Sequence, residues 1–178
     1  MNRLAKHRCY LCGPMEFAPD GGVNWREYVK EQLADLKIYW FDPCNKPTDD
    51  FIEDDTTHEL LRSSKAMGRF DFVREMVKPI RCFDLRMSDV SDFLIVHLDN
   101  TIPAFGTIEE ISNANREKKP ILVHVEQGAK TASSWLFAMI PPCMVFSTWE
   151  DLFAYVRHIA TDEKIERMNR WFFFNFDD

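Results

Sequence analysis

The sequence predicts an α/β fold, with a doubly wound, five-stranded and mostly parallel sheet and helices on both faces. Short apolar runs of the kind that form buried strands alternate along the chain with stretches of helical spacing. The clearest unit is a strand over 93–98, a loop, a helix and a strand over 121–125, which has the length of a right-handed parallel crossover. We therefore expect a flavodoxin-like or Rossmann-like sheet with strand order 2-1-3-4-5.

The N-terminal segment predicts the first strand and helix. Residues 8–12 form an apolar run that stops at Gly13-Pro14, where a glycine lets backbone amides approach a ligand. A long loop follows, with a turn signal at 19–22. Asn24 is a suitable cap for a helix over 25–36, whose apolar residues recur at helical spacing.

The next stretch predicts a second strand over 37–41, followed by an insert. Residues 44–55 are polar and proline-containing, and are expected to form a surface loop. A helix is expected to start at Thr56 or Thr57 and to reach about Met67. A further helical pattern begins at residue 69, and Pro79 is expected to kink or restart that helix before Val90.

The C-terminal third predicts a short helix over 135–140, a fifth strand over 144–146 and a final helix. The final helix has a capping-box pattern over Ser147–Glu150. The tail from residue 165 ends in an aromatic-rich stretch, which we expect to dock on the body or on another subunit, because such a surface would not stay solvated.

Length and composition indicate a single domain over 1–178 with a substantial core, since 46% of the residues are apolar and 29% are charged. The net charge of −7 argues against binding to a nucleic-acid polymer, which requires a basic surface. No stretch has the length and apolarity of a membrane span or a secretory signal, so we expect a cytoplasmic protein.

Cys9 and Cys12 form a C-x-x-C pattern, which can indicate zinc or redox chemistry. The alternation from Cys9 to Cys12 also fits the interior of a strand, and no second pair of ligands accompanies it. We expect reduced thiols, no cofactor and no metal. The five histidines show no metal-binding spacing, and His97 and His124 lie inside predicted strands, where they are expected to be core or rim residues.

The loop after the 93–98 strand contains the main candidate for chemistry. Glu110 follows Thr107 by three residues, so the pair matches a capping box in which the glutamate only bonds the backbone. Alternatively, the helix N-terminus stabilises an ionised carboxylate that attacks an electron-poor carbon. Glu109 is equally close, and helical geometry alone does not choose between the two.

A second carboxyl group near such a nucleophile would provide a general acid for a leaving group, as in glycoside cleavage. Asp84 and Asp92 are candidates, although each is equally explained as a solvated or helix-end acid. Met15, Phe17 and Trp25 would suit the wall of a site for a flat base, or the core. The chain has no G-x-S-x-G, P-loop or G-x-G-x-x-G motif, so no such motif indicates a serine hydrolase, a kinase or a dinucleotide dehydrogenase.

Taken in order, several motifs resemble the nucleoside 2-deoxyribosyltransferase family, in particular its phage-type, diverged members. They span roughly residues 8–125 and comprise Tyr10–Met15, Trp25-Arg26, Phe41-Asp42-Pro43, Asp84 with Ser91-Asp92, and Gly106–Ile111 with Ala114 and Lys119-Pro120.

This resemblance implies that Glu110, rather than Glu109, is a nucleophile that forms a glycosyl-enzyme intermediate, and that Asp84 assists protonation of the departing base. It implies a nucleoside or nucleotide substrate, a free base or water as acceptor, and a homo-oligomer. The residues expected at the substrate are Gly13, Pro14, Met15, Trp25, Asp42, Asp92, Asp99, Gly106 and Thr107.

The chain departs from the family pattern at Ala104, where the family has an Asp or a phosphate-binding Ser, and Asp99 is a possible substitute. The 44–77 insert has no counterpart in the pattern. The prediction is therefore 2′-deoxyribosyl transfer, with two alternatives: a nucleoside 5′-monophosphate N-glycosidase, or a nucleotide-binding module without catalytic activity.

Overall fold

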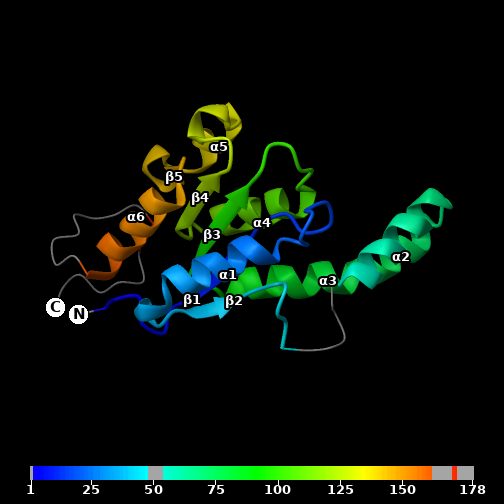
Figure 1. Cartoon of the computed structure of the whole chain (residues 1–178), viewed down its shortest axis with the longest axis horizontal. Helices are drawn as coiled ribbons and strands as arrows, with labels where there is room; N and C mark the ends of the chain where they lie inside the picture. Colours follow the sequence, from blue (N-terminus) through cyan, green and yellow to red (C-terminus); the bar gives the residue numbers. More distant parts are fainter. Residues whose placement is uncertain (1, 48–53, 162–169, 172–178) are drawn as a thin grey trace.

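A computed structural model describes residues 2–47, 54–161 and 170–171 (Figure 1). The strands are β1 (Arg8–Cys12), β2 (Tyr39–Phe41), β3 (Phe93–Leu98), β4 (Ile121–Val125) and β5 (Val145–Phe146). The α-helices are α1 (Val23–Gln32), α2 (Asp55–Ala66), α3 (Phe70–Val90), α4 (Phe105–Arg116), α5 (Ser134–Met139) and α6 (Trp149–Thr161).

The sheet confirms the predicted topology. Its order is β2-β1-β3-β4-β5, and every described strand pair is parallel. All residues of β4 and the first four of β3 are buried, as expected for central strands covered on both faces. In a parallel sheet the carboxyl ends of the strands lie at one edge, and this is where open α/β sheets bind ligands.

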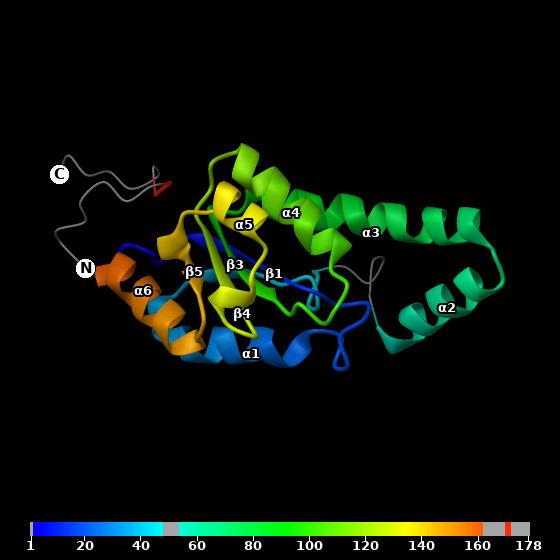
Figure 2. The ribbon, with the colours of Figure 1, turned by 90° about the horizontal axis from the view of Figure 1, so that it is seen from above.

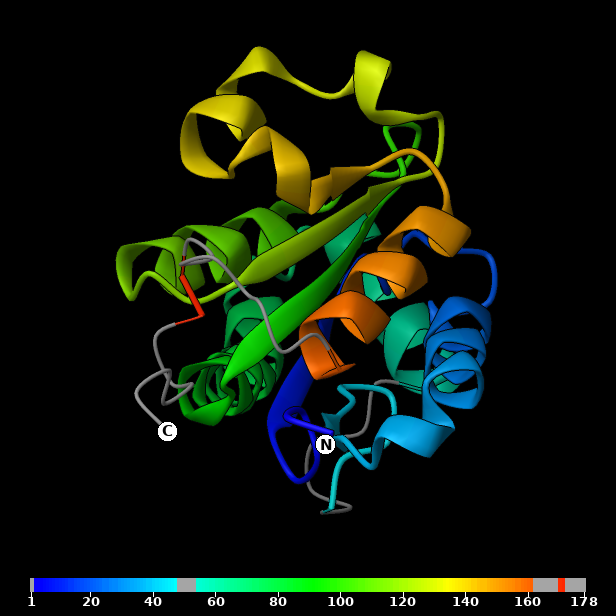
Figure 3. The ribbon, with the colours of Figure 1, turned by 90° about the vertical axis from the view of Figure 1, so that its left-hand side faces the viewer.

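Helices cover both faces of the sheet, as predicted. Figure 3 shows α3 and α4 on one face and α1 and α6 on the other. The apolar core runs through the strands and continues into the inward sides of these helices, for example at Val29, Ile111 and Val156, all fully buried. The burial of aliphatic side chains on both faces provides most of the driving force for this arrangement.

The insert between β2 and α3 forms α2, which packs against the first part of α3 (Figure 2). Asp54 caps α2 by accepting a hydrogen bond from the Thr57 amide at 2.7 Å, so this helix starts slightly earlier than predicted. The predicted restart of the helix at Pro79 is wrong, because α3 is one continuous helix of 21 residues that contains Pro79. The proline removes one intrahelical donor, while the packing of α3 on α2 and α4 supports the helix on either side.

Three smaller predictions need correction. Asn24 does not cap α1; instead the Asp20 carboxylate accepts hydrogen bonds from the amides of Gly22 and Asn24, at 3.0 and 2.8 Å. β2 begins at Tyr39, two residues later than expected. At α6, Thr148 rather than Ser147 caps the helix, because its hydroxyl group pairs with the amide and the carboxylate of Asp151.

Most of the aromatic tail lies outside the described residues, so its predicted docking is described only at Trp171. That side chain is fully buried, its ring centroid lies 5.4 Å from that of Phe93, and its indole N–H donates to the Tyr155 hydroxyl at 3.2 Å. Within the described ranges, no helix combines the length and the apolarity needed to cross a membrane.

Candidate active site

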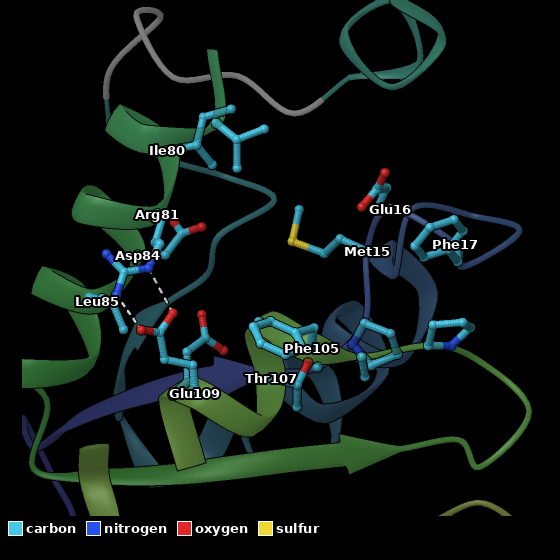
Figure 4. Close-up of a pocket in the computed structure, with 17 residues that line it drawn as sticks. Met15, Glu16, Phe17, Ile80, Arg81, Asp84, Leu85, Phe105, Thr107 and Glu109 are labelled. Carbon is cyan, nitrogen blue, oxygen red and sulfur yellow. Dashed lines mark hydrogen bonds and ion pairs between the residues drawn. The ribbon is translucent and has the colours of Figure 1, made fainter. Parts of the chain in front are cut away.

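A cavity of about 360 Å³ opens at the carboxyl ends of β1 and β3. Three segments line it: the loop after β1, one side of α3, and the loop that leads into the first turns of α4. Figure 4 shows Arg81, Asp84 and Leu85 projecting from α3 on one side, and Met15, Glu16 and Phe17 on the other. Its size lies within the range of small-molecule sites, about 300–1,000 Å³.

Glu110 lies at this cavity and is held by two side chains from β1. The Tyr10 hydroxyl group donates to Oε1 at 2.7 Å, and the Cys12 thiol donates to Oε2 at 3.0 Å. The predicted capping box does not form, because α4 begins at Phe105 and no side chain caps it; Thr107 is already inside the helix. The Glu110 carboxylate therefore faces β1 and the cavity instead of its own backbone.

Tyr10 and Cys12 are hydrogen-bond donors of fixed protonation state. Burial, followed by the negative charges of Glu110 and Asp84, raises the pKa of the Tyr10 phenol well above its usual value. Burial and the charge of Glu110 likewise raise the pKa of the Cys12 thiol. Both groups keep their protons near neutral pH, so they orient the Glu110 carboxylate without adding charge to it.

The structure distinguishes Glu109 from Glu110, which the sequence alone does not. The guanidinium group of Arg81 pairs with Glu109 through two hydrogen bonds, one of them 2.7 Å from Nε to Oε2. These hydrogen bonds, with the charge of Arg81, lower the pKa of the Glu109 carboxyl. Glu109 is thus paired with a cation, whereas the Glu110 carboxylate accepts hydrogen bonds from two neutral donors, so the two acids differ in their electrostatic surroundings.

Asp84 projects from α3 beside Arg81, opposite the loop that carries Met15 (Figure 4), and forms an ion pair with Lys46, whose Nζ lies 2.9 Å from Oδ1. The Lys46 side chain is only 2% exposed. Part of the expected surface loop therefore reaches into the protein, and the prediction for residues 44–47 is wrong in this respect. The lysine stabilises the negative charge of Asp84.

The loop after β1 is fixed by close packing around Gly13 and Arg26. A Cβ atom on Gly13 would lie 2.7 Å from the Trp25 ring, so only glycine fits there without displacement. The fully buried Arg26 guanidinium donates to the carbonyl groups of Leu11, Gly13 and Gly22, at 3.1, 2.9 and 2.7 Å. This network orders the backbone that forms the cavity wall.

The structure places seven of the predicted site residues at the cavity, namely Gly13, Pro14, Met15, Asp84, Gly106, Thr107 and Glu110. It does not bring Trp25 there. The indole stacks on Trp149 and lies against His97, on the other face of the sheet, so the expected aromatic wall consists of Met15 and Phe17 only. Asp42 is also absent from the lining; it pairs with Lys30 at 2.8 Å and lies 3.7 Å from Arg26.

Asp92 lies at the opposite edge of the sheet. It precedes β3 and accepts hydrogen bonds from the Arg8 amide at 2.7 Å and the Arg8 guanidinium at 2.8 Å, so it joins the amino ends of β1 and β3. Asp99 lines a second cavity of about 480 Å³, between the loop after β3 and α5. Its carboxylate accepts from Thr101 and Gln127.

Four residues that shape the site were not predicted in these roles: Tyr10, Cys12, Arg26 and Lys46. Tyr10 and Cys12 are two positions apart in a strand and so share a face, which is a signal that the sequence offers. Arg26 was noted only as part of a motif, although an arginine within an apolar helix face is a candidate for burial with partners. Lys46 lies in a polar segment that gives no such signal.

The likeness of this chain to solved structures extends over most of its length. The 2-deoxyribosyltransferase of Bacillus psychrosaccharolyticus matches with a TM-score of 0.57 and 16% identity, over 84% of this chain and 95% of that chain. A conserved protein from Enterococcus faecalis V583 matches with a TM-score of 0.50 and 17% identity, over 87% and 99%. No protein-family model and no curated protein sequence matches the chain.

These matches show that the chain has the doubly wound α/β fold seen in a 2-deoxyribosyltransferase. At 16–17% identity they speak for the fold alone. Function must be argued from the cavity and its side chains.

Proposed function

We propose that the chain cleaves the N-glycosidic bond of a nucleoside through Glu110 and transfers the 2-deoxyribosyl group to a second base. The observation that carries the proposal is the position of Glu110, which is held by Tyr10 and Cys12 in a cavity that also contains Asp84. The fold shared with a 2-deoxyribosyltransferase supports the same chemistry. The motif resemblance assigns the same two acids, Glu110 and Asp84.

In the first step, Glu110 attacks the anomeric carbon and forms an ester bond to the sugar. The bond between carbon and base nitrogen breaks, and its electron pair leaves with the base. In the second step a nitrogen of an incoming base attacks the same carbon, the Glu110 carboxylate is released, and the proton that this nitrogen loses returns to the group that protonated the first base. Water in place of the base gives net hydrolysis. Two displacements at one carbon retain its configuration.

The departing base requires a proton, which we assign to the pair formed by Asp84 and Lys46. Asp84 lines the cavity, while Lys46 lies behind it at 2.9 Å with its side chain almost fully buried. An aspartate paired with a lysine is a poor acid alone, because the pair favours the carboxylate. The proton would pass from the Lys46 ammonium group to the Asp84 carboxylate and from there to the base, which leaves Lys46 neutral and Asp84 ionised, so the two residues act as a unit.

The charges at the cavity favour a nucleoside over a nucleoside 5′-monophosphate. Four carboxylates are among the described lining residues, and Arg81 is the one basic residue there. The nearby cations already have acidic partners: Arg81 pairs with Glu109, Lys46 with Asp84, and Lys65 with Glu16. Ala104, at the N-cap position of α4, has no polar side chain and adds no hydrogen-bond donor. A phosphate group would thus lack the unpaired cations that it usually requires.

The test is mass spectrometry of products from a panel of deoxynucleosides, ribonucleosides and their 5′-monophosphates, with and without a second base. The expected result is base release from deoxynucleosides and a new nucleoside when a second base is present. Glu110→Gln should abolish both products, whereas Glu109→Gln, the matched control on the same helix turn, should retain them. Full activity of Glu110→Gln would refute the proposal.

The alternative of a nucleotide-binding module without catalysis makes a different prediction in the same panel. A ligand would bind, as seen by calorimetry, yet remain intact after long incubation. Glu110→Gln would then alter affinity and nothing else. The monophosphate N-glycosidase alternative predicts base release from the monophosphates and none from the nucleosides.

A further inference from the structure

A cluster of potential metal ligands lies on the face of the sheet opposite Glu110. His97 and His124 are register partners at the carboxyl ends of β3 and β4, and Glu126 directly follows β4. Their side chains point toward α1 and α6, as the contacts of His97 with Trp25 and Trp149 show. None of the three residues lines either of the cavities described above.

The distances within this cluster suit a single cation. The Nδ1 atoms of His97 and His124, one from each ring, are 3.1 Å apart. One ligand atom from each residue lies within 4.8 Å of those of the other two. Tetrahedral zinc with bonds of about 2.0–2.1 Å to nitrogen separates two imidazole nitrogens by about 3.3 Å. The histidine pair is therefore already close to the spacing of two zinc ligands.

The two imidazole rings are held in place by packing, so little order is lost on binding. The Trp149 ring stacks on His124 with centroids 4.0 Å apart and on His97 at 5.6 Å. His124 is 3% exposed, whereas the Glu126 side chain is 52% exposed. Two ligands are thus rigid and the third can rotate onto the cation from the solvent side, which also provides a path of entry.

The charges around the cluster favour a cation. Glu126 contributes a negative charge, and the acidic side chains of Glu150, near His124, and of Asp20 and Asp99, near His97, act on the two rings. Arg26 is the opposing positive group. Two imidazoles and one carboxylate form a ligand set that suits zinc and its neighbours in the first transition series.

We propose that His97, His124 and Glu126 bind one divalent transition-metal ion of the zinc type, with a fourth position open to water. The ion would join the carboxyl ends of β3 and β4 on the α6 face of the sheet. The proposal is independent of glycosyl transfer at Glu110, because it uses other residues on the other face. The competing explanation for the short nitrogen–nitrogen distance is a direct N–H···N hydrogen bond between two metal-free histidines.

The test is titration of the chelator-treated full chain with zinc, followed by calorimetry, and with cobalt, followed by its visible absorption spectrum. The expected result is one ion per chain, with the intense cobalt bands of a four-coordinate site. Trp149 reports independently, because a paramagnetic ion bound beside His124 should quench its fluorescence. His124→Gln removes a direct ligand and should weaken zinc binding by more than about 100-fold. Loss of a residue that only hydrogen-bonds a ligand can already cost up to about 100-fold in metal affinity.

His158→Gln, which replaces an exposed histidine of α6, is the matched control and should bind zinc as the parent does. Glu126→Gln is the second variant, because the exposed Glu126 side chain contributes little to the core; this variant should weaken zinc binding as well. An absence of zinc and cobalt binding would overturn the proposal. Equal zinc affinity in the parent, His124→Gln and Glu126→Gln would also overturn it, by placing the ion elsewhere.

Discussion

The Tyr10 hydroxyl group lies 2.7 Å from Oε1 of Glu110, although the two residues are 100 positions apart in the chain. This contact joins the first strand of the sheet to the first turns of α4, and it orients the carboxylate on which the proposed chemistry depends. Tyr10 is only 1% exposed, so its phenol has little alternative to this partner. The geometry of Glu110 is thus a property of the assembled sheet and of no single segment.

Removal of that hydroxyl group should impair the reaction more than the fold. Tyr10→Phe keeps the ring and its packing but leaves Oε1 without its donor, so we expect kcat to fall about 10²-fold, the size of effect that a misplaced reacting group produces. Tyr39→Phe, at an exposed position of β2, is the matched control and should leave kcat unchanged. An unchanged kcat in Tyr10→Phe, measured by base release, would show that the contact does not position the nucleophile.

Lys46 and Asp84 should behave as one unit in catalysis. We expect Asp84→Asn and Lys46→Met each to lower kcat, by about 10²-fold, since each interrupts delivery of the proton. The double variant should be no slower than Asp84→Asn, because the second change removes a partner that no longer has a role. If the two losses of kcat multiply in the double variant, Lys46 and Asp84 act independently and the proposed proton relay is wrong. Substrates whose base leaves without a proton should be least affected.

Gly13 should tolerate no side chain, in contrast to Gly106. The Cβ atom of Gly13→Ala would lie 2.7 Å from the Trp25 ring, whereas one on Gly106 would have nothing within 4 Å. We expect Gly13→Ala to lower the free energy of unfolding by about 1–3 kcal/mol through overpacking. Gly106→Ala, inside a helix, should be neutral or stabilising by up to about 1 kcal/mol. Urea denaturation of the two variants and the parent measures both, and equal stabilities would contradict this packing.

Asp92 should contribute to stability in a pH-dependent way. Partial burial acts to raise the pKa of its carboxyl, but hydrogen bonds from the Arg8 side chain and amide, with the charges of Arg8 and His7, outweigh this and lower the pKa. A pKa below that of the unfolded chain means that the stabilisation is complete above about pH 3.9 and is lost as the pH falls through the lower, folded-state value.

Asp92→Asn should accordingly lower the free energy of unfolding by about 1–2 kcal/mol at neutral pH, and this difference should shrink in acid. Asp89→Asn, at an exposed helix position, is the matched control and should change little at either pH. Base release by folded Asp92→Asn should equal that of the parent, because Asp92 lies at the edge of the sheet opposite the cavity. A large loss of activity in fully folded Asp92→Asn would instead indicate that Asp92 contributes to the substrate site.

The strand order and most element positions could be predicted, because buried parallel strands are continuous apolar runs and the intervening helices show regular spacing. The wrong predictions came from local sequence rules, which tertiary contacts override. Pro79 does not break α3, since packing on α2 and α4 supports the helix on both sides. The T-x-x-E pattern at Thr107 is no cap, because α4 begins two residues before Thr107.

The site could be predicted only in part, for a similar reason. Motifs indicated Glu110 and Asp84, and the structure brings both to one cavity. The partner of Asp84, Lys46, comes from a polar insert whose path no periodicity reveals. His97 and His124 are separated by 27 positions and show no ligand spacing, yet parallel register places them side by side. Such pairings arise from the sheet, so a search for sequence motifs misses them.

If Glu110 carries the sugar during the reaction, a covalent glycosyl-enzyme intermediate forms on its carboxylate and can be trapped. A deoxynucleoside would be mixed with the protein without an acceptor base, quenched rapidly in acid and digested for peptide mass spectrometry. We expect one added deoxyribosyl group on the peptide that contains Glu110, its loss on addition of a second base, and its absence in Glu110→Gln. Base release at full rate with an unmodified Glu110 peptide, or with the sugar on Glu109, would show that Glu110 is not the nucleophile.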